Sequence, residues 1–152
     1  MSNNTFFDEK ANSTYTMSNK KMVADPYWYG GSPLWVLAEK QQMLTASFYW
    51  VASETPILNT TPTYYYYYND KIKIEKRINQ IKEWLSLPEK TRPHLITFYM
   101  PDVDDAAHNY GPDSKQAEAA VQNIDNVIHQ ILYKVGLFQL VVVTIIQVFF
   151  LI

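Results

Sequence analysis

The chain has 152 residues, of which 47% are hydrophobic, so it can form a packed core and is not a disordered tail. Its 13 Lys and Arg residues against 15 Asp and Glu residues give a net charge of -2. This balance argues against a dedicated binder of duplex nucleic acid, which needs a basic surface stripe. The sequence contains no cysteine, which excludes disulfides and thiolate metal sites, so any metal must bind Asp, Glu or His.

The N-terminal third has few strong signals of regular structure. Residues 1–10 are polar and lack the apolar core of a secretory signal. Residues 25–31 (DPYWYGG) are typical of an aromatic turn. The Ser-Pro pair at 32–33 offers an N-cap and a first helical residue, and it predicts a short helix over 32–42. Residues 44–51 (LTASFYWV) then predict a strand.

The middle of the chain contains the clearest helical pattern. Residues 53–70, with two prolines and five consecutive tyrosines, predict a loop. Apolar residues then recur at spacings of four, three and four, which predicts an amphipathic helix closed by Pro88. Residues 94–100 (HLITFYM) predict a second strand, and residues 101–113 a polar loop. The apolar positions of the helix are Ile74, Ile78, Ile81 and Leu85.

A long helix and a third strand complete the pattern. Ser114 can cap a helix that ends near Gly136. Residues 140–146, rich in Val and Ile, predict a strand buried on both faces of a parallel sheet. Strands alternating with helices predict an α/β fold, a largely parallel sheet flanked by helices. The expected buried face of the long helix carries Ala117, Val121, Ile124, Val127, Ile128, Ile131 and Val135.

The C-terminal segment allows a second interpretation. Residues 135–152 are almost all apolar, and their length is marginal for a membrane span of about 20 residues. Membrane association of this segment is therefore the alternative to a buried strand. Residues 147–152 have no clear assignment, so we place the domain over residues 1–146 and treat 147–152 as an apolar tail of unclear role.

The expected loop after strand 94–100 is the richest in chemistry, with the sequence PDVDDAAHNYGPDS. Active sites of parallel sheets lie outside the carboxyl ends of the strands, which is where this loop is expected. Asp104 and His108 are four residues apart, so they can reach one ion if the segment bends or forms one helical turn. Carboxylate oxygen and imidazole nitrogen both suit zinc. The alternative is a solvated acidic loop.

The segment VDDAAHNYGP, residues 103–112, resembles the V-D-x-x-G-H-x-Y-G-P motif of the type I phosphodiesterase/nucleotide pyrophosphatase family, within the alkaline phosphatase superfamily. Further segments resemble the same family in the same order, and together the likeness runs from about Asn3 to Val135. Several ordered motifs are more specific than any one alone. These segments are NNTFFDEK, WYGGSPLWVLAEKQ, LTASFYW, KIEKRINQIKEWLSLPEKTRPH and LITFYM.

The resemblance implies a partial alkaline-phosphatase-like sandwich and a chemistry. Members of the family use two zinc ions and a threonine nucleophile to hydrolyse phosphodiesters of nucleotides or lipids. By position, Asp104 and His108 match two ligands of one zinc. Asn4 matches an asparagine that holds a non-bridging phosphate oxygen. Three aromatic residues match positions around the nucleobase or leaving group of the substrate: Trp50, Tyr68 and Tyr99.

The sequence also departs from the family pattern. The threonine of the family lies upstream of the matched segment, and its Asp-His pair after the strand at 140–146 is replaced here by Gln147-Val148. A later ligand histidine is also absent, and Ala107 replaces a glycine. We therefore expect a fragment with at most a partial zinc site and no catalysis of its own, because catalytic zinc generally has three protein ligands.

Three further expectations complete this interpretation. The alternative function is a non-catalytic nucleotide-binding or interaction protein derived from the same family. As a fragment, the chain would lack sheet strands that the family has before and after the matched segment. An uncovered sheet edge and helix face would remain, so we expect self-association. Relatives in this family are usually secreted, periplasmic or membrane-anchored, although residues 1–10 carry no signal sequence.

Overall fold

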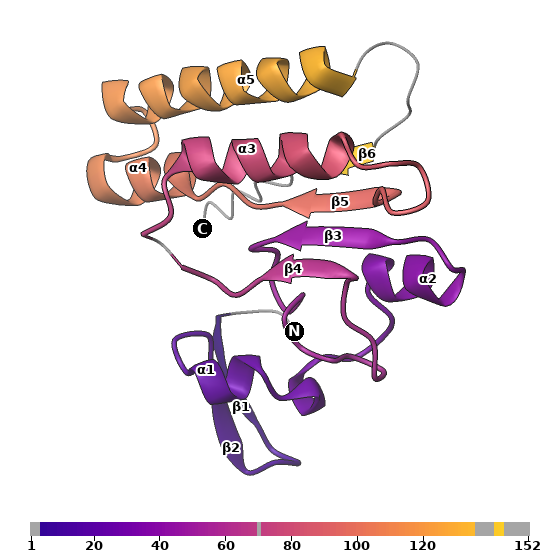
Figure 1. Ribbon diagram of the computed structural model, residues 1–152. Helices are drawn as coiled ribbons and strands as arrows, with labels where there is room; N and C mark the ends of the chain where they lie inside the picture. Colours follow the sequence, from indigo (N-terminus) through magenta and orange to yellow (C-terminus); the bar gives the residue numbers. More distant parts are fainter. Residues whose placement is uncertain (1–3, 70, 136–141, 145–152) are drawn as a thin grey trace.

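The structure is a computed structural model and describes residues 4–69, 71–135 and 142–144. Its main body is a sheet in the order β4-β3-β5-β6, in which every neighbouring pair is parallel (Figure 1). The strands are β3 (Thr45–Phe48), β4 (Tyr64–Tyr66), β5 (Leu95–Phe98) and β6 (Val142–Thr144). The helices are α2 (Leu34–Lys40), α3 (Ile74–Leu85), α4 (Asp102–Tyr110) and α5 (Lys115–Val135).

A smaller N-terminal part precedes the sheet. It is an antiparallel hairpin of β1 (Thr5–Asp8) and β2 (Ser13–Thr16), followed by α1 (Lys20–Val23) and a 3₁₀ turn over Pro26–Trp28. Phe6, Tyr15 and Trp28 pack their rings together, with centroids 5.2 to 5.9 Å apart. The hydroxyl of Thr55 donates a hydrogen bond of 2.6 Å to the carbonyl of Val23, which ties this part to the loop after β3.

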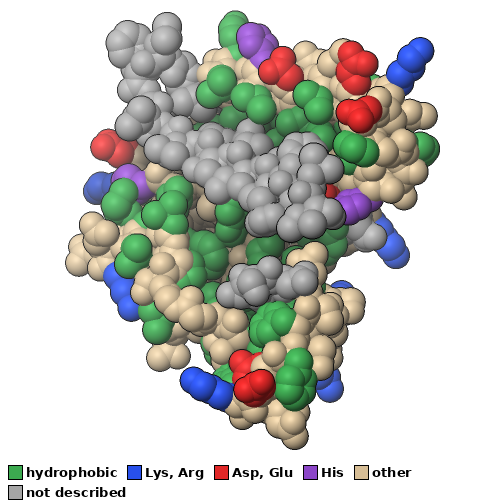
Figure 2. Space-filling view, turned by 180° about the vertical axis from the view of Figure 1, so that it is seen from behind, with side chains coloured by type: hydrophobic (Ala, Val, Ile, Leu, Met, Phe, Trp, Pro, Cys, Tyr) green, Lys and Arg blue, Asp and Glu red, His purple; other side chains and the backbone are tan. Residues whose placement is uncertain are grey.

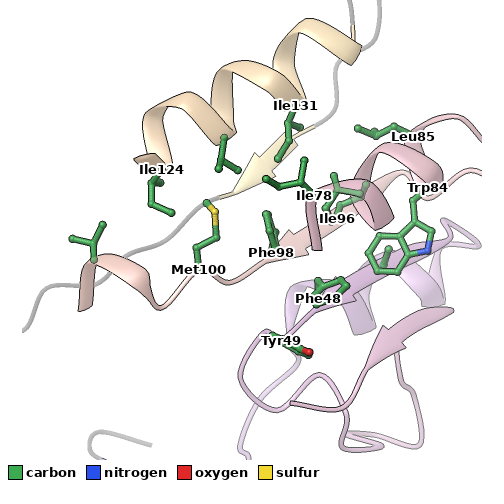
Figure 3. Packing of buried hydrophobic residues seen from close by; sticks show 14 residues of the cluster. Phe48, Tyr49, Ile78, Trp84, Leu85, Ile96, Phe98, Met100, Ile124 and Ile131 are labelled. Carbon is green, nitrogen blue, oxygen red and sulfur yellow. The ribbon is translucent and has the colours of Figure 1, made fainter. Parts of the chain in front are cut away.

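The period of two in the short strands divides their side chains between two layers. Ala46 and Phe48 of β3 belong to the larger core, as do their β5 partners Ile96 and Phe98. On the opposite face, Leu95 packs with α2 residues in a second cluster. The larger core is covered by α3 and α5 (Figure 3). The sheet therefore separates the α3 and α5 layer from the α2 layer.

The predicted amphipathic helix before Pro88 is confirmed, since α3 spans Ile74–Leu85 and buries Ile78, Ile81 and Leu85. Ser114 caps α5 as predicted, because its hydroxyl accepts a hydrogen bond of 3.1 Å from the Ala117 N–H. Of the expected buried face, Ala117, Ile124, Val127 and Ile131 are buried, whereas Val121 is 52% exposed, so the prediction is wrong for Val121.

Three sequence predictions differ from the structure. Helix α2 begins at Leu34 after Pro33, and no side chain caps it, so Ser32 is not its N-cap. The expected loop over 53–70 contains β4, whose tyrosines pair with β3. The expected loop over 101–113 is mostly helix α4, because three aspartates in its first turn suit the positive end of a helix dipole.

The expected strand over 140–146 is confirmed for residues 142–144, where β6 pairs with β5. Gly136 and the tail over 147–152 lie outside the described residues, so the domain limits stay predictions. No helix within the described ranges is both long enough and apolar enough to span a bilayer.

Candidate functional site

The candidate site begins where β5 ends. After Phe98, the chain runs through Tyr99, Met100 and Pro101 directly into α4, so the first turn of α4 stands at the carboxyl edge of the parallel sheet (Figure 1). This is the edge where parallel sheets place their ligands. Val103 and Met100 are buried in the larger core and anchor the start of α4.

Asp104 and His108 face each other on consecutive turns of α4. The distance from His108 Nε2 to Asp104 Oδ1 is 3.5 Å. Their side chains are 80% exposed for His108 and 44% exposed for Asp104, so an ion pair between them contributes little stability. The spacing of four residues therefore brings a carboxylate and an imidazole together at the surface, where both are accessible to an ion.

Tyr99 lies beside this acidic turn. Burial raises the pKa of its hydroxyl to about 12, with further contributions from Asp104, Tyr68 and Asp105. The phenol is therefore neutral at physiological pH and can donate a hydrogen bond. For Asp105, burial is also the main cause of a raised pKa, followed by the charges of Asp104 and Asp102, while His108 and Arg77 act in the opposite direction.

A second group of aromatic residues lies at the carboxyl end of β3. Tyr49 adopts a left-handed backbone conformation (φ 64°), which is strained for a residue with a side chain. Its ring centroid lies 5.2 Å from that of Tyr68, and the guanidinium carbon of Arg77 lies 5.1 Å from the Tyr49 ring centroid. This cation–π contact holds Tyr49, and Tyr49 in turn supports Tyr68.

The structure therefore brings four of the six predicted site residues into one region: Asp104, His108, Tyr99 and Tyr68. Trp50 is half-buried and packs against the α2 cluster with Trp35, and its carbonyl accepts a hydrogen bond from the Ser53 hydroxyl. Asn4 precedes β1, has an exposed side chain, and its carbonyl accepts a hydrogen bond of 2.9 Å from Met17 N–H. These contacts place Trp50 at the α2 cluster and the Asn4 backbone beside Met17.

Sequence reasoning missed Arg77 and Tyr49. The sequence contained a signal for Arg77, since this charged residue lies on the apolar face of α3 between Ile74 and Ile81. Charged side chains are rarely buried unless they have a partner. Tyr49 gave no such signal, because its importance comes from its contacts with Tyr68 and Arg77, which lie far along the chain.

The side chains of Asp104 and His108 are of the types that bind zinc, but the two together supply only part of a zinc site. Within residues 4–69, 71–135 and 142–144, no three His, Asp or Glu side chains are grouped to hold a metal ion. Asp104 and His108 offer one oxygen and one nitrogen ligand from a rigid helix, a combination found in zinc sites.

Comparison with known proteins decides the family. The family model described as type I phosphodiesterase / nucleotide pyrophosphatase matches residues 1–142. The chain belongs to this family. Ectonucleotide pyrophosphatase/phosphodiesterase family member 1 of Rattus norvegicus is 34% identical over 125 residues, and Venom phosphodiesterase 2 of Crotalus adamanteus is 33% identical over 125 residues. Each match covers 82% of this chain but only 14% and 15% of those relatives.

Solved structures of the phosphodiesterase family have the same fold. Human ectonucleotide pyrophosphatase / phosphodiesterase 5 matches with a TM-score of 0.78 and 25% identity, covering 91% of this chain and 37% of that one. An inactive variant of the murine protein, solved in complex with AMP, matches with a TM-score of 0.74 and 22% identity, covering 87% of this chain and 35% of that one. The expected alkaline-phosphatase-like α/β fold is therefore confirmed.

Proposed function

We propose that this chain is part of a zinc-dependent phosphodiesterase/nucleotide pyrophosphatase that hydrolyses phosphodiester or pyrophosphate bonds of nucleotides. The observation that carries the proposal is the pair of Asp104 and His108, 3.5 Å apart at the carboxyl edge of the parallel sheet. The family supports the reaction class, because its matched relatives are named as phosphodiesterases and nucleotide pyrophosphatases.

Each site residue has a role in this proposal. Asp104 and His108 hold one zinc ion, which would supply Lewis-acid polarisation of a phosphoryl oxygen when bound. The Asn4 amide donates a hydrogen bond to a non-bridging phosphate oxygen. Tyr68 and Tyr99 contact the nucleobase or leaving group, and Trp50 would do so if its ring turned away from the α2 cluster.

Zinc titration followed by calorimetry tests the metal half of the proposal. We expect weak binding that falls at least tenfold in His108→Ala, because one of two protein ligands is lost. The matched control is His129→Ala on α5, also an exposed helical histidine, which should bind zinc as the unaltered chain does. Equal zinc affinity in all three proteins would show that His108 is not a ligand.

We further propose that the 152-residue chain alone hydrolyses phosphodiester model substrates at the background rate. Two protein ligands are fewer than the three that catalytic zinc sites generally use. Turnover that requires zinc and disappears in His108→Ala would contradict this proposal.

A second candidate function is nucleotide binding without turnover. The observation that favours it is the aromatic surface of Tyr68, backed by Tyr49, since an exposed ring can stack on a nucleobase. A murine relative was solved with AMP. Calorimetry with AMP separates the two candidates: binding with background hydrolysis supports the second, and the absence of binding removes it.

A further inference from the structure

Arg77 of α3 is a charged residue in the interior of the protein, with only 5% of its surface exposed. Arginine is rarely buried to this extent without a carboxylate partner, and the ion pairs among the described residues do not include Arg77. Its Nε instead donates a hydrogen bond of 2.8 Å to the Ile72 carbonyl, and its guanidinium carbon lies 5.1 Å from the ring centroid of Tyr49. The role of this buried charge therefore lies in what these two partners hold.

The two contacts of Arg77 act on the segment that connects β4 to α3 and carries Tyr68. Arg77 binds the carbonyl of Ile72 near the end of this segment. It reaches Tyr68 near the start of the segment through Tyr49, whose ring centroid lies 5.2 Å from that of Tyr68. Glu54 accepts a hydrogen bond of 3.2 Å from the Tyr68 N–H, but this bond fixes the backbone and leaves the direction of the ring to its aromatic contact.

Tyr49 has a backbone conformation that requires support from its neighbours. Its φ of 64° is left-handed, which is costly for a residue with a Cβ, and its side chain is buried. Its ring packs on that of Phe48, with centroids 4.5 Å apart (Figure 3). Such strain persists only where the surrounding structure holds it, and it gathers at functional sites. Here the strained backbone directs a buried ring at Tyr68, which is 50% exposed.

The segment that Arg77 holds also borders a hollow in the protein surface. Tyr68, Ile72 and Arg77 line a cavity of about 390 Å³, together with Pro101 and Asp102 at the start of α4. A change in the direction of the Tyr68 ring would therefore change the wall of this cavity beside the candidate site. An aromatic ring that is already held in place loses less conformational entropy when a ligand packs on it, so its fixation raises affinity.

We propose that Arg77 is a positioning residue of the candidate site, which fixes the direction of the Tyr68 ring through Tyr49 and through the Ile72 carbonyl. Arg77 itself does not contact the ligand in this proposal. The inference rests on the proposed function for the view that Tyr68 contacts a nucleotide. The direction of the Tyr68 ring, however, is a property of this chain alone and can be measured without a ligand.

Nuclear magnetic resonance of the full 152-residue chain tests the positioning directly. The ring signals of Tyr68 are identified by their loss in Tyr68→Leu, and the Tyr49 ring nearby displaces them from the values of an exposed tyrosine. In Arg77→Met we expect most of this displacement to disappear, whereas Arg77→Lys, which keeps a cation for the Tyr49 ring, should retain it. The Tyr66 ring, stacked on Phe48 at 4.8 Å, should keep its signals in both variants and so report an intact sheet.

Arg92→Met is the matched control. Arg92 also donates from Nε to a carbonyl five residues earlier, that of Leu87 at 2.9 Å, but it precedes β5 and so lies at the opposite edge of the parallel sheet from Tyr68. This variant should leave the Tyr68 signals unchanged. Unchanged Tyr68 signals in Arg77→Met, or an equal change in Arg92→Met, would overturn the proposal. If Arg77→Met does not fold, Arg77→Gln replaces it with the same expectation, because glutamine keeps an N–H donor but has no charge.

AMP titration of the same variants measures the consequence for a ligand. Arg77→Met should weaken AMP binding by about fivefold or more, Arg77→Lys should recover most of the affinity, and Arg92→Met should bind as the unaltered chain does. Equal AMP affinity in Arg77→Met and the unaltered chain would overturn the role of Arg77 in the site. If the unaltered chain does not bind AMP, the nucleotide contact of Tyr68 in the proposed function fails, while the ring signals still decide whether Arg77 positions Tyr68. The two failures are therefore distinguishable.

Discussion

One carboxylate oxygen of Glu39 accepts four hydrogen bonds and joins three parts of the chain. Both the N–H and the hydroxyl of Thr45 donate to it, at 2.8 and 2.7 Å, and both donors of Thr63 do so at 2.9 and 2.8 Å. Glu39 thus connects α2, the first residue of β3 and the residue before β4. Burial alone would raise the pKa of Glu39, but these hydrogen bonds outweigh it and lower the pKa below its usual 4.5.

Glu39→Gln is expected to lower the free energy of unfolding at pH 7 by about 1–3 kcal/mol, because charge-assisted hydrogen bonds become neutral and one amide hydrogen faces the donors. Since the folded pKa is lower than the unfolded one, the carboxylate stabilises fully above pH 4.5, and this contribution is lost as the pH falls below 4.5. Urea unfolding at pH 7 and pH 3 measures this. The difference from the unaltered chain should shrink at pH 3, and a constant difference would contradict the pKa argument. Glu89→Gln, at an exposed position, is the control.

At the scale of elements, the connection between α4 and α5 positions the candidate site. Gly111 follows α4 with φ 93° and ψ 149°, a conformation that residues with a Cβ rarely adopt. The hydroxyl of Ser114 donates a hydrogen bond of 2.7 Å to the Gly111 carbonyl and also caps α5. Helix α4 therefore ends at a fixed point, and its turn with Asp104 and His108 is held between β5 and this connection.

Gly111→Ala is expected to lower the free energy of unfolding by about 1–3 kcal/mol through backbone strain. A steric clash does not contribute, because an added Cβ would meet no atom within 4 Å. Gly30→Ala is a matched control, since its added Cβ would also meet nothing within 4 Å and its φ is not in the left-handed region. We expect Gly30→Ala to change stability little or to raise it slightly. Thermal unfolding of both variants measures the effect, and equal midpoints would show that Gly111 is not strained by a side chain.

The elements that the sequence predicted well are those with a strong local pattern. Helix α3 follows from its isoleucine spacing, and β3 and β5 follow from short runs of apolar and β-forming residues. Strand β4 was missed because five consecutive tyrosines carry no alternation, and only pairing with β3 makes them a strand. Helix α4 was missed because aspartates are weak helix formers in general but favourable in a first turn.

The candidate site was likewise predictable only where its residues lie close together in the sequence. The spacing of Asp104 and His108 gave their proximity, because i and i+4 residues meet on a helix. The contact of Arg77 with Tyr49, and the cavity that Arg77 shares with Asp102, depend on how α3 and α4 pack beside the sheet. No local pattern contains that information.

At the scale of the whole molecule, the larger core joins the sheet to α3 and α5, and the side chains of these elements meet in one layer (Figure 3). The side of the molecule opposite to the view of Figure 1 carries many hydrophobic side chains and few charged ones near its centre, next to residues that the structure does not describe (Figure 2). Because α5 contributes Ile124, Val127 and Ile131 to the larger core, the stability of the fold depends on the packing of α5.

Two adjacent residues of α5, Ile131 and Leu132, differ in burial, so substituting each by alanine tests how much the packing of α5 stabilises the fold. Ile131 is 1% exposed within the larger core, whereas Leu132 is 55% exposed. Ile131→Ala should lower the free energy of unfolding by about 2–5 kcal/mol, the transfer term plus the cavity it leaves, and Leu132→Ala should change it by less than about 0.5 kcal/mol. Denaturant unfolding of both variants gives the two values. Similar losses of unfolding free energy in the two variants would contradict the packing of α5 on the sheet through Ile131.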